Sequence, residues 1–195
     1  MNILSVIFRK IFKLLYWGFA QFSYGSFGKG SSIHKPMFIP NKDHIFIGEH
    51  VHIRDFARIE PIVQWNGKKL NPRIIIEDSV FIEQGLHLTC AGNVHIHKGC
   101  LFAPYVYITD VMHDYQDINT SVLLQNITIK ETEIGENCFL GIGAKILEGV
   151  KIGKHCIVGA SSVVVRDIPD FCVVSGIPAK IIKRYNDQTN TWDKC

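Results

Sequence analysis

Large aliphatic residues recur at a spacing of six through the second half of this chain: Ile134, Leu140, Ile146, Ile152, Val158 and Val164. Four positions after each of the first five stands a smaller residue, in the order Cys138, Ala144, Val150, Cys156 and Ser162. Neither the period of an α-helix nor the alternation of a simple strand gives this pattern. A repeat of six with one large and one small residue predicts a solenoid whose coils have several short, flat faces.

The same spacing continues upstream in three sets, namely Ile47, Ile53 and Ile59, then Ile76, Ile82 and Leu88, then Ile96, Phe102 and Ile108. Two insertions interrupt it, at residues 63–72, which have turn chemistry, and at residues 109–133. Because a gap in the aliphatic stack would leave a cavity, we expect both insertions to be surface loops. Long loops inside a compact repeat are often functional.

The run from Glu133 to Tyr185, EIGENCFLGIGAKILEGVKIGKHCIVGASSVVVRDIPDFCVVSGIPAKIIKRY, resembles the C-terminal half of the hexapeptide-repeat acyltransferases. This family includes galactoside, maltose and polysaccharide O-acetyltransferases, and with the upstream hexads the likeness covers residues 45–185. The resemblance implies an all-β fold, a left-handed parallel β-helix. Its handedness comes from the resemblance alone, since general rules favour right-handed crossovers.

We expect three parts. Residues 1–44 form an N-terminal amphipathic helix and connector, residues 45–185 the β-helix acyltransferase domain with the protruding loop 109–133, and residues 186–195 a short C-terminal tail. A chain of 195 residues with 47% hydrophobic residues can bury one core. Residues 23–43 are rich in glycine, serine and proline, which predicts an irregular connector.

Residues 3–22 are apolar and aromatic but are interrupted by Arg9, Lys10 and Lys13, which favours an amphipathic helix over a transmembrane helix or a secretory signal. Two roles stay open. The helix lies on a membrane surface, with its basic residues toward the lipid headgroups, or it packs on the end of the solenoid or on a neighbouring subunit.

The composition limits the compartment and the partners. The net charge of +3 is small and spread along the chain, which gives little support for nucleic-acid binding. Cys100, Cys138 and Cys156 occupy small-residue positions of the hexad, where a thiol behaves as a small hydrophobe. We therefore expect a reduced, cytoplasmic protein, with peripheral contact to the cytoplasmic membrane face as an open possibility.

In the resembled family, a loop that protrudes from the β-helix supplies the catalytic histidine. The spacing from Ile96 to His113 matches that pattern, so the resemblance implies His113 as the catalytic residue. A sugar hydroxyl is a poor nucleophile, and an imidazole that titrates near pH 6.5 is suited to removing its proton. The group that orients the second ring nitrogen stays open between Asp110, Asp114 and a backbone carbonyl.

The resemblance also implies acetyl-coenzyme A as the donor and a homotrimer with sites at the subunit interfaces. The positions that match the cofactor contacts are Gly141, Ala160 and Ser161 for backbone contacts and Arg166, Lys180 and Lys183 for the phosphates. The backbone N–H of Gly141 is also a candidate for stabilising the oxyanion.

Glu83 lies where relatives place polar residues that bind the acceptor, and Asp110 is the second predicted substrate residue. The expected reaction is acetyl transfer to a hydroxyl of a sugar, in the biosynthesis of a bacterial surface polysaccharide. The alternative acceptor is a small molecule such as an antibiotic or a free sugar.

Two His-x-His pairs, His50 with His52 and His95 with His97, are expected to project outward side by side. Two ligands do not complete a zinc site, so we expect no metal. The β-helical carbonic anhydrases, which hold zinc with three histidines, are nevertheless a competing class of enzyme, and a non-catalytic scaffold is a third possibility.

Overall fold

The computed structural model describes residues 22–195. The helix predicted over residues 3–22 lies outside this part except for its last residue. Within residues 22–195, no helix is long and apolar enough to cross a membrane.

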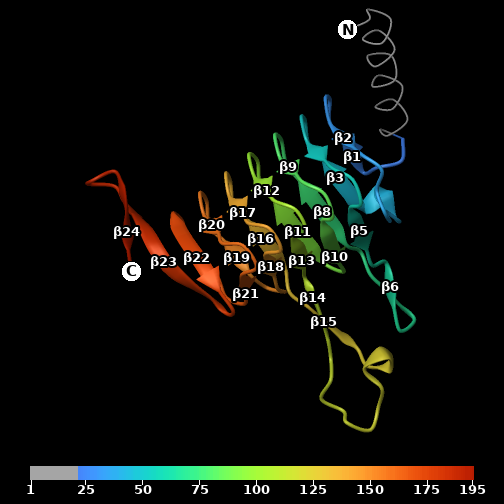
Figure 1. Cartoon of the computed structure of the whole chain (residues 1–195). Coiled ribbons are helices and arrows are strands. Elements are labelled where there is room, and N and C mark those ends of the chain that lie inside the picture. Colours follow the sequence, from blue (N-terminus) through green and yellow to red (C-terminus); the bar gives the residue numbers. More distant parts are fainter. Residues whose placement is uncertain (1–21) are drawn as a thin grey trace, which may run out of the picture.

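Three parallel sheets form the sides of a β-helix, and each coil from β3 to β21 contributes one strand to each sheet (Figure 1). The strands of sheet A are β1 (Ser26–Phe27), β3 (Ile45–Ile47), β8 (Arg73–Ile76), β11 (Asn93–Ile96), β16 (Thr132–Ile134) and β19 (Lys151–Ile152). The parallel strands of sheet B are β2 (Ser32–Ile33), β4 (His52–Ile53), β9 (Phe81–Ile82), β12 (Leu101–Phe102), β17 (Phe139–Leu140), β20 (Ile157–Val158) and β22 (Cys172–Gly176). The strands of sheet C are β5 (Arg58–Pro61), β10 (His87–Cys90), β13 (Tyr107–Thr109), β18 (Lys145–Ile146) and β21 (Val163–Val164).

The predicted aliphatic step forms the core. On sheet A, strand pairing places Ile47, Ile76, Ile96, Ile134 and Ile152 in one inward-facing row, each at most 2% exposed. The large apolar residues that follow them at the six-residue spacing form the equivalent buried rows of sheets B and C. Each large side chain therefore covers its counterpart in the next coil, which removes apolar surface from water along the whole helix.

Glycine is required where the coils stack most closely. A Cβ atom on Gly28 would lie 2.2 Å from the carbonyl oxygen of Gly48, and one on Gly141 would lie 2.7 Å from the backbone nitrogen of Ala160. Contacts this short are not tolerated, so these corners exclude a side chain.

The cysteines at small-residue positions are buried free thiols, as predicted for a stacked hydrophobe. Cys138 and Cys156 donate from sulfur to the backbone carbonyls of Gly153 and Pro169, at 3.0 and 3.1 Å. Their thiol groups thus pair with the backbone of the next coil.

The parallel pairing begins earlier in the chain than residue 45. Residues 23–43, expected as an irregular connector, contribute β1 and β2, which pair with β3 and β4, as well as a 3₁₀ turn, η1 (Lys42–His44). The six-residue spacing is present here too, at Phe27, Ile33 and Ile39, and all three side chains pack in or against the core.

The C-terminal end continues sheet B alone. After β22, the chain turns back to form β23 (Ala179–Asn186) and β24 (Thr191–Lys194), both antiparallel to their neighbours. The tail expected at residues 186–195 thus contains an edge strand, β24 (Figure 1).

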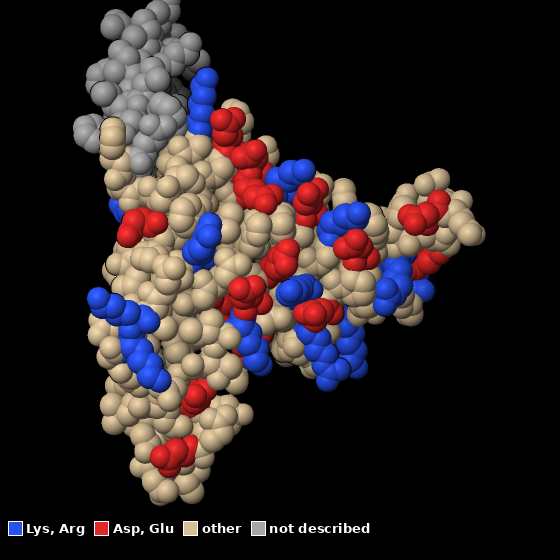
Figure 2. All heavy atoms as spheres, turned by 180° about the vertical axis from the view of Figure 1, so that it is seen from behind, with Lys and Arg blue, Asp and Glu red and all other residues tan. Residues whose placement is uncertain are grey.

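Charged side chains of both signs are interspersed over the face shown in Figure 2, so this face carries no continuous basic surface.

Candidate functional site

Two excursions leave the β-helix from the carboxyl ends of sheet C strands. The first is the short hairpin of β6 (Gln64–Trp65) and β7 (Lys68–Lys69). The second is the predicted loop, which contains the antiparallel strands β14 (Val111–His113) and β15 (Ile127–Ile129) and the 3₁₀ turn η2 (Val122–Leu124). Figure 1 shows both projecting from the same side of the solenoid.

Asp110 fixes the base of the second excursion. Its fully buried carboxylate accepts hydrogen bonds from the backbone N–H groups of Ala91 and Gly92, at 2.8 and 2.7 Å, and lies 3.3 Å from the sulfur of Cys90. Burial raises the pKa of Asp110, although these hydrogen bonds act in the opposite direction. An acceptor would have to break these contacts to reach the carboxylate, so the structure does not support the prediction that Asp110 binds substrate.

The two excursions dock on each other. The indole Nε1 of Trp65 donates to the carbonyl oxygen of Gln125 at 3.0 Å, and Asn66 Nδ2 donates to the carbonyl oxygens of Leu124 and Gln125 at 3.1 and 2.8 Å. The short hairpin therefore supports the second half of the long excursion, just before β15. The sequence predicted residues 63–72 only as a loop and gave no signal for this support.

His113 lies at the end of β14, opposite Ile127, and its side chain is exposed. Its imidazole packs against the Trp65 indole in a T-shaped arrangement, with ring centroids 4.9 Å apart and an interplanar angle of 65°. Within residues 22–195 the ring nitrogens of His113 have no hydrogen-bond partner. They are therefore accessible to a substrate from the solvent side.

Within the described residues, neither aspartate proposed to orient His113 forms a hydrogen bond or an ion pair with its ring. Asp110 is engaged with the backbone of Ala91 and Gly92, and Asp114 accepts a hydrogen bond from Thr128 Oγ1 at 2.7 Å. Packing against Trp65, rather than a carboxylate, limits the orientation of the ring within the chain.

Most residues predicted to bind the cofactor gather at the corner between sheets B and C. Gly141, Ala160 and Ser161 belong to two stacked turns at this corner, and Ala160 and Ser161 are exposed. The backbone N–H of Gly141 donates to the carbonyl oxygen of Val158 at 2.8 Å, so the oxyanion role considered for it is wrong.

The predicted basic residues are divided between two places. Lys180, on β23, is paired with Ser175, whose side chain lies over the corner at Gly159. Lys183 lies further along β23, opposite Val173. Arg166 follows β21 and so lies at the other end of sheet C, away from this corner.

Glu83 also lies at the corner between sheets B and C, between β9 and β10, where its carboxylate is 3.7 Å from Arg54 Nε. His113 follows β13 at the opposite end of the sheet C strands. The structure of one chain therefore does not bring His113 together with Glu83 or with the corner at Gly141.

The parallel β-helix and its six-residue repeat are typical of the hexapeptide-repeat transferases. Residues 131–166 match the protein family described as bacterial transferase hexapeptide (six repeats). The resemblance to the hexapeptide-repeat acyltransferases is confirmed, and so is the fold class, a left-handed parallel β-helix.

Among individual proteins, the chain is 35% identical over 128 residues to the putative lipopolysaccharide biosynthesis O-acetyl transferase WbbJ of Escherichia coli K12, covering 62% of this chain and 65% of that protein. It is 35% identical over 109 residues to the galactoside O-acetyltransferase of Lactococcus lactis, covering 54% of this chain and 51% of that protein. The chain thus spans less than two thirds of the length of either relative.

The structure is similar to that of AntD, an N-acyltransferase from Bacillus cereus, crystallised with dTDP and 3-hydroxybutyryl-CoA. The TM-score is 0.71 at 18% identity, and the match covers 88% of this chain and 89% of AntD. At this level of identity the likeness concerns the fold.

Proposed function

We propose that this chain is an acetyltransferase that moves an acetyl group from acetyl-coenzyme A to a hydroxyl of a sugar, with His113 as the general base. The observation that carries the proposal is the placement of His113. Its exposed imidazole has ring nitrogens without a hydrogen-bond partner among residues 22–195, and it lies on an excursion that is anchored at its base by Asp110 and braced by Trp65. The names of the relatives, a lipopolysaccharide O-acetyl transferase and a galactoside O-acetyltransferase, support the choice of acceptor.

In the proposed reaction, a ring nitrogen of His113 takes the proton of the sugar hydroxyl while the oxygen attacks the thioester carbonyl carbon. The tetrahedral intermediate then collapses and the carbon–sulfur bond breaks. The imidazolium returns its proton to the departing sulfur, so the products are an acetyl ester and free coenzyme A, and His113 is neutral again. A positioned base of this kind contributes roughly 10²- to 10⁴-fold to the rate.

We further propose that the chain works as a homotrimer with its sites at the subunit interfaces. The corner at Gly141, where most of the predicted cofactor residues gather, is called the cofactor corner. Within one chain this corner and His113 lie at opposite ends of sheet C, so a neighbouring copy is needed to complete the site. The tip of the long excursion supports this proposal, because the side chains of Ile118, Leu123 and Leu124 are 92%, 69% and 68% exposed. Several large apolar side chains exposed on one excursion are typical of a segment that a partner covers.

The proposed setting is the cytoplasm, where acetyl-coenzyme A and a sugar precursor of a surface polysaccharide would meet. Residues 3–22 are proposed to hold the protein at the membrane face on which such precursors are assembled. We expect the full chain to partition onto anionic vesicles and a variant lacking residues 1–22 to stay in solution. Equal partitioning of the two would remove membrane contact from the proposal.

The experiment that tests the reaction class is release of the coenzyme A thiol from acetyl-coenzyme A in the presence of a panel of sugars, nucleotide sugars and antibiotics. We expect release that depends on a sugar acceptor. Release with antibiotics alone would favour the small-molecule alternative. No release with any acceptor, together with no binding of acetyl-coenzyme A, would contradict the proposal.

A further inference from the structure

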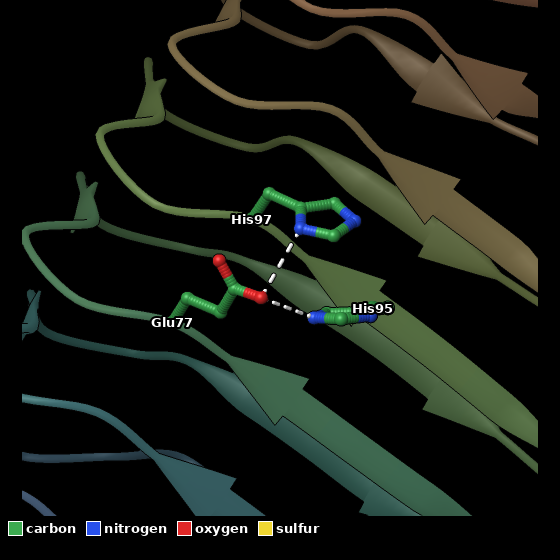
Figure 3. A group of neighbouring side chains, drawn as sticks. All are labelled: Glu77, His95 and His97. Carbon is green, nitrogen blue, oxygen red and sulfur yellow. Dashed lines mark hydrogen bonds and ion pairs between the residues drawn. The ribbon is translucent and has the colours of Figure 1, made fainter.

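Two histidines and a glutamate meet on the outer face of sheet A (Figure 3). The Oε1 atom of Glu77 lies 2.8 Å from His95 Nε2 and 3.1 Å from His97 Nδ1. The two imidazole rings stack with their centroids 4.0 Å apart. Within residues 22–195, this is the one group of three or more His, Cys, Asp or Glu residues whose ligand atoms all lie within 4.8 Å of one another.

The register of the coils creates the cluster. His95 lies on β11 beside Ile75 of β8 and Glu133 of β16, and Glu77 and His97 directly follow β8 and β11. Because neighbouring parallel strands are about 4.8 Å apart, outward side chains at equivalent positions meet without any bending of the backbone. The group thus belongs to the rigid part of the molecule.

The surrounding contacts hold the ligand atoms in place. The second carboxylate oxygen of Glu77 accepts a hydrogen bond from the backbone N–H of Lys98 at 3.0 Å. On the side of His97 away from Glu77, Nε2 lies 2.7 Å from Glu133 Oε1. A histidine ligand commonly has its other ring nitrogen fixed by a carboxylate in this way, which sets its tautomer.

The cluster is open to ions from solution. The side chains of His95, His97 and Glu77 are 24%, 23% and 32% exposed. His97 and Glu133 also line one end of an open groove of about 520 Å³ that continues over the later strands of sheet A. A hydrated cation can therefore reach the ligand atoms without rearrangement of the fold.

We propose that Glu77, His95 and His97 bind a divalent transition-metal ion of the zinc class on the outer face of sheet A. Two imidazoles and one carboxylate suit such an ion, with water as the fourth ligand. The ion would replace the protons that now join the three side chains, and Glu133 would orient His97. Its effect would be structural, because it would link the coil of β8 to that of β11. This site is independent of the transferase reaction proposed above.

The second His-x-His pair provides a matched control. His50 and His52 have the same spacing, but within the described residues they belong to no such cluster, and His52 Nδ1 lies 2.9 Å from Ser32 Oγ. His50 has a φ of 55°, a left-handed conformation that asparagine also adopts readily. The substitution His50→Asn therefore removes an imidazole with little strain.

The test uses the full chain without a polyhistidine tag, stripped with EDTA and titrated with Co²⁺ as an optical probe and with Zn²⁺ as a competitor. We expect one saturable site per chain, visible Co²⁺ bands with nitrogen and oxygen ligation, and a higher melting temperature with metal than with EDTA. Glu77→Gln and His95→Gln should each weaken binding at least tenfold, and Glu133→Gln by about 10- to 100-fold, as for other outer ligands of a metal. His50→Asn should bind like the wild type.

Absence of saturable binding up to about 1 mM metal would overturn the proposal. So would unchanged affinity in Glu77→Gln and His95→Gln, or an equal loss in His50→Asn, because binding would then be non-specific. Melting temperatures in EDTA show whether each variant is folded. Should the ligand variants not fold, the wild-type titration and Glu133→Gln decide the question.

Discussion

The indole of Trp65 and the imidazole of His113 form a T-shaped pair, with their ring centroids 4.9 Å apart. The two residues are far apart in the sequence and belong to different excursions, which are joined by the hydrogen bond from Trp65 Nε1 to the carbonyl oxygen of Gln125 at 3.0 Å. The proposed base is thus held by aromatic packing against a second loop. The orientation of the His113 ring thus depends on Trp65, which takes no part in the proposed proton transfer.

We predict that Trp65→Ala lowers the rate of acetyl transfer about tenfold, because a misplaced catalytic group loses much of the benefit of orientation. Trp65→Phe keeps an aromatic ring and loses only the Nε1 hydrogen bond, so its rate should stay within about threefold of the wild type. Steady-state kinetics on both variants test this. Equal rates for Trp65→Ala and the wild type would show that the indole does not position His113.

Asp110 is predicted to hold the base of the long excursion. Asp110→Ala leaves the buried N–H group of Ala91 and the partly buried N–H group of Gly92 unpaired, and a buried unpaired group costs about 1–3 kcal/mol of unfolding free energy. Urea denaturation measures this loss. A loss below about 0.5 kcal/mol would mean that water replaces the carboxylate.

The same residue predicts a pH dependence. Burial raises the pKa of Asp110 in the folded chain, so the folded state holds this proton more tightly than the unfolded state. The stabilisation from this group is therefore greatest at low pH, and it is lost as the pH rises from the ordinary value of 3.8 through the raised folded pKa. Asp110→Asn lacks this titration. The unfolding free energy of the wild type relative to Asp110→Asn should fall as the pH rises across this window, and a rise would contradict the assignment.

The cysteines are predicted to differ sharply in reactivity. Five of the six are at most 1% exposed, and Cys195 is exposed. The hydrogen bond to Cys100, together with burial, raises the pKa of Cys138 to about 12, which suppresses its thiolate. An aromatic disulfide reagent should titrate one thiol in the native protein and all six in denaturant, and Cys195→Ser should abolish the native reaction. Rapid labelling of a second thiol in the native protein would contradict this packing.

Lys180 is predicted to contact a phosphate of coenzyme A from its place beside the cofactor corner. An exposed charge contact of this kind contributes roughly 1 kcal/mol, so Lys180→Ala should weaken coenzyme A binding about fivefold. If the partner is the 3′-phosphate, dephospho-coenzyme A should bind the variant and the wild type equally. Arg166→Ala is the comparison, because Arg166 lies at the other end of sheet C. An unchanged affinity in Lys180→Ala would remove this residue from the cofactor site.

The core was predictable because the residues at the six-residue spacing are those that stack inside the coils. Every large aliphatic residue of the six-residue spacing, from Ile47 to Val164, lies in the core as predicted. The first coil was missed because the turn residues of segment 23–43 obscured the same spacing at Phe27 and Ile33.

The site was less predictable, because its contacts join segments that the repeat does not relate. Nothing in residues 63–72 signals that Trp65 meets His113, and nothing near Asp110 signals that its carboxylate folds back onto Ala91 and Gly92. The outward direction expected for His95 and His97 follows from strand alternation. Their meeting with Glu77 depends on the inter-coil register, which the broken spacing between Leu88 and Ile96 concealed.

The most direct test of the proposed function compares the wild type, His113→Ala and His155→Ala in acetyl transfer from acetyl-coenzyme A to the sugar acceptor found in the panel. His155 is an exposed histidine outside the excursions, and its variant controls for loss of an imidazole. We predict that His113→Ala lowers the turnover rate by roughly 10²- to 10⁴-fold, with acetyl-coenzyme A affinity and melting temperature unchanged, and that His155→Ala retains the wild-type rate. A His113→Ala variant that turns over within about threefold of the wild type would contradict the assignment of His113 as the general base.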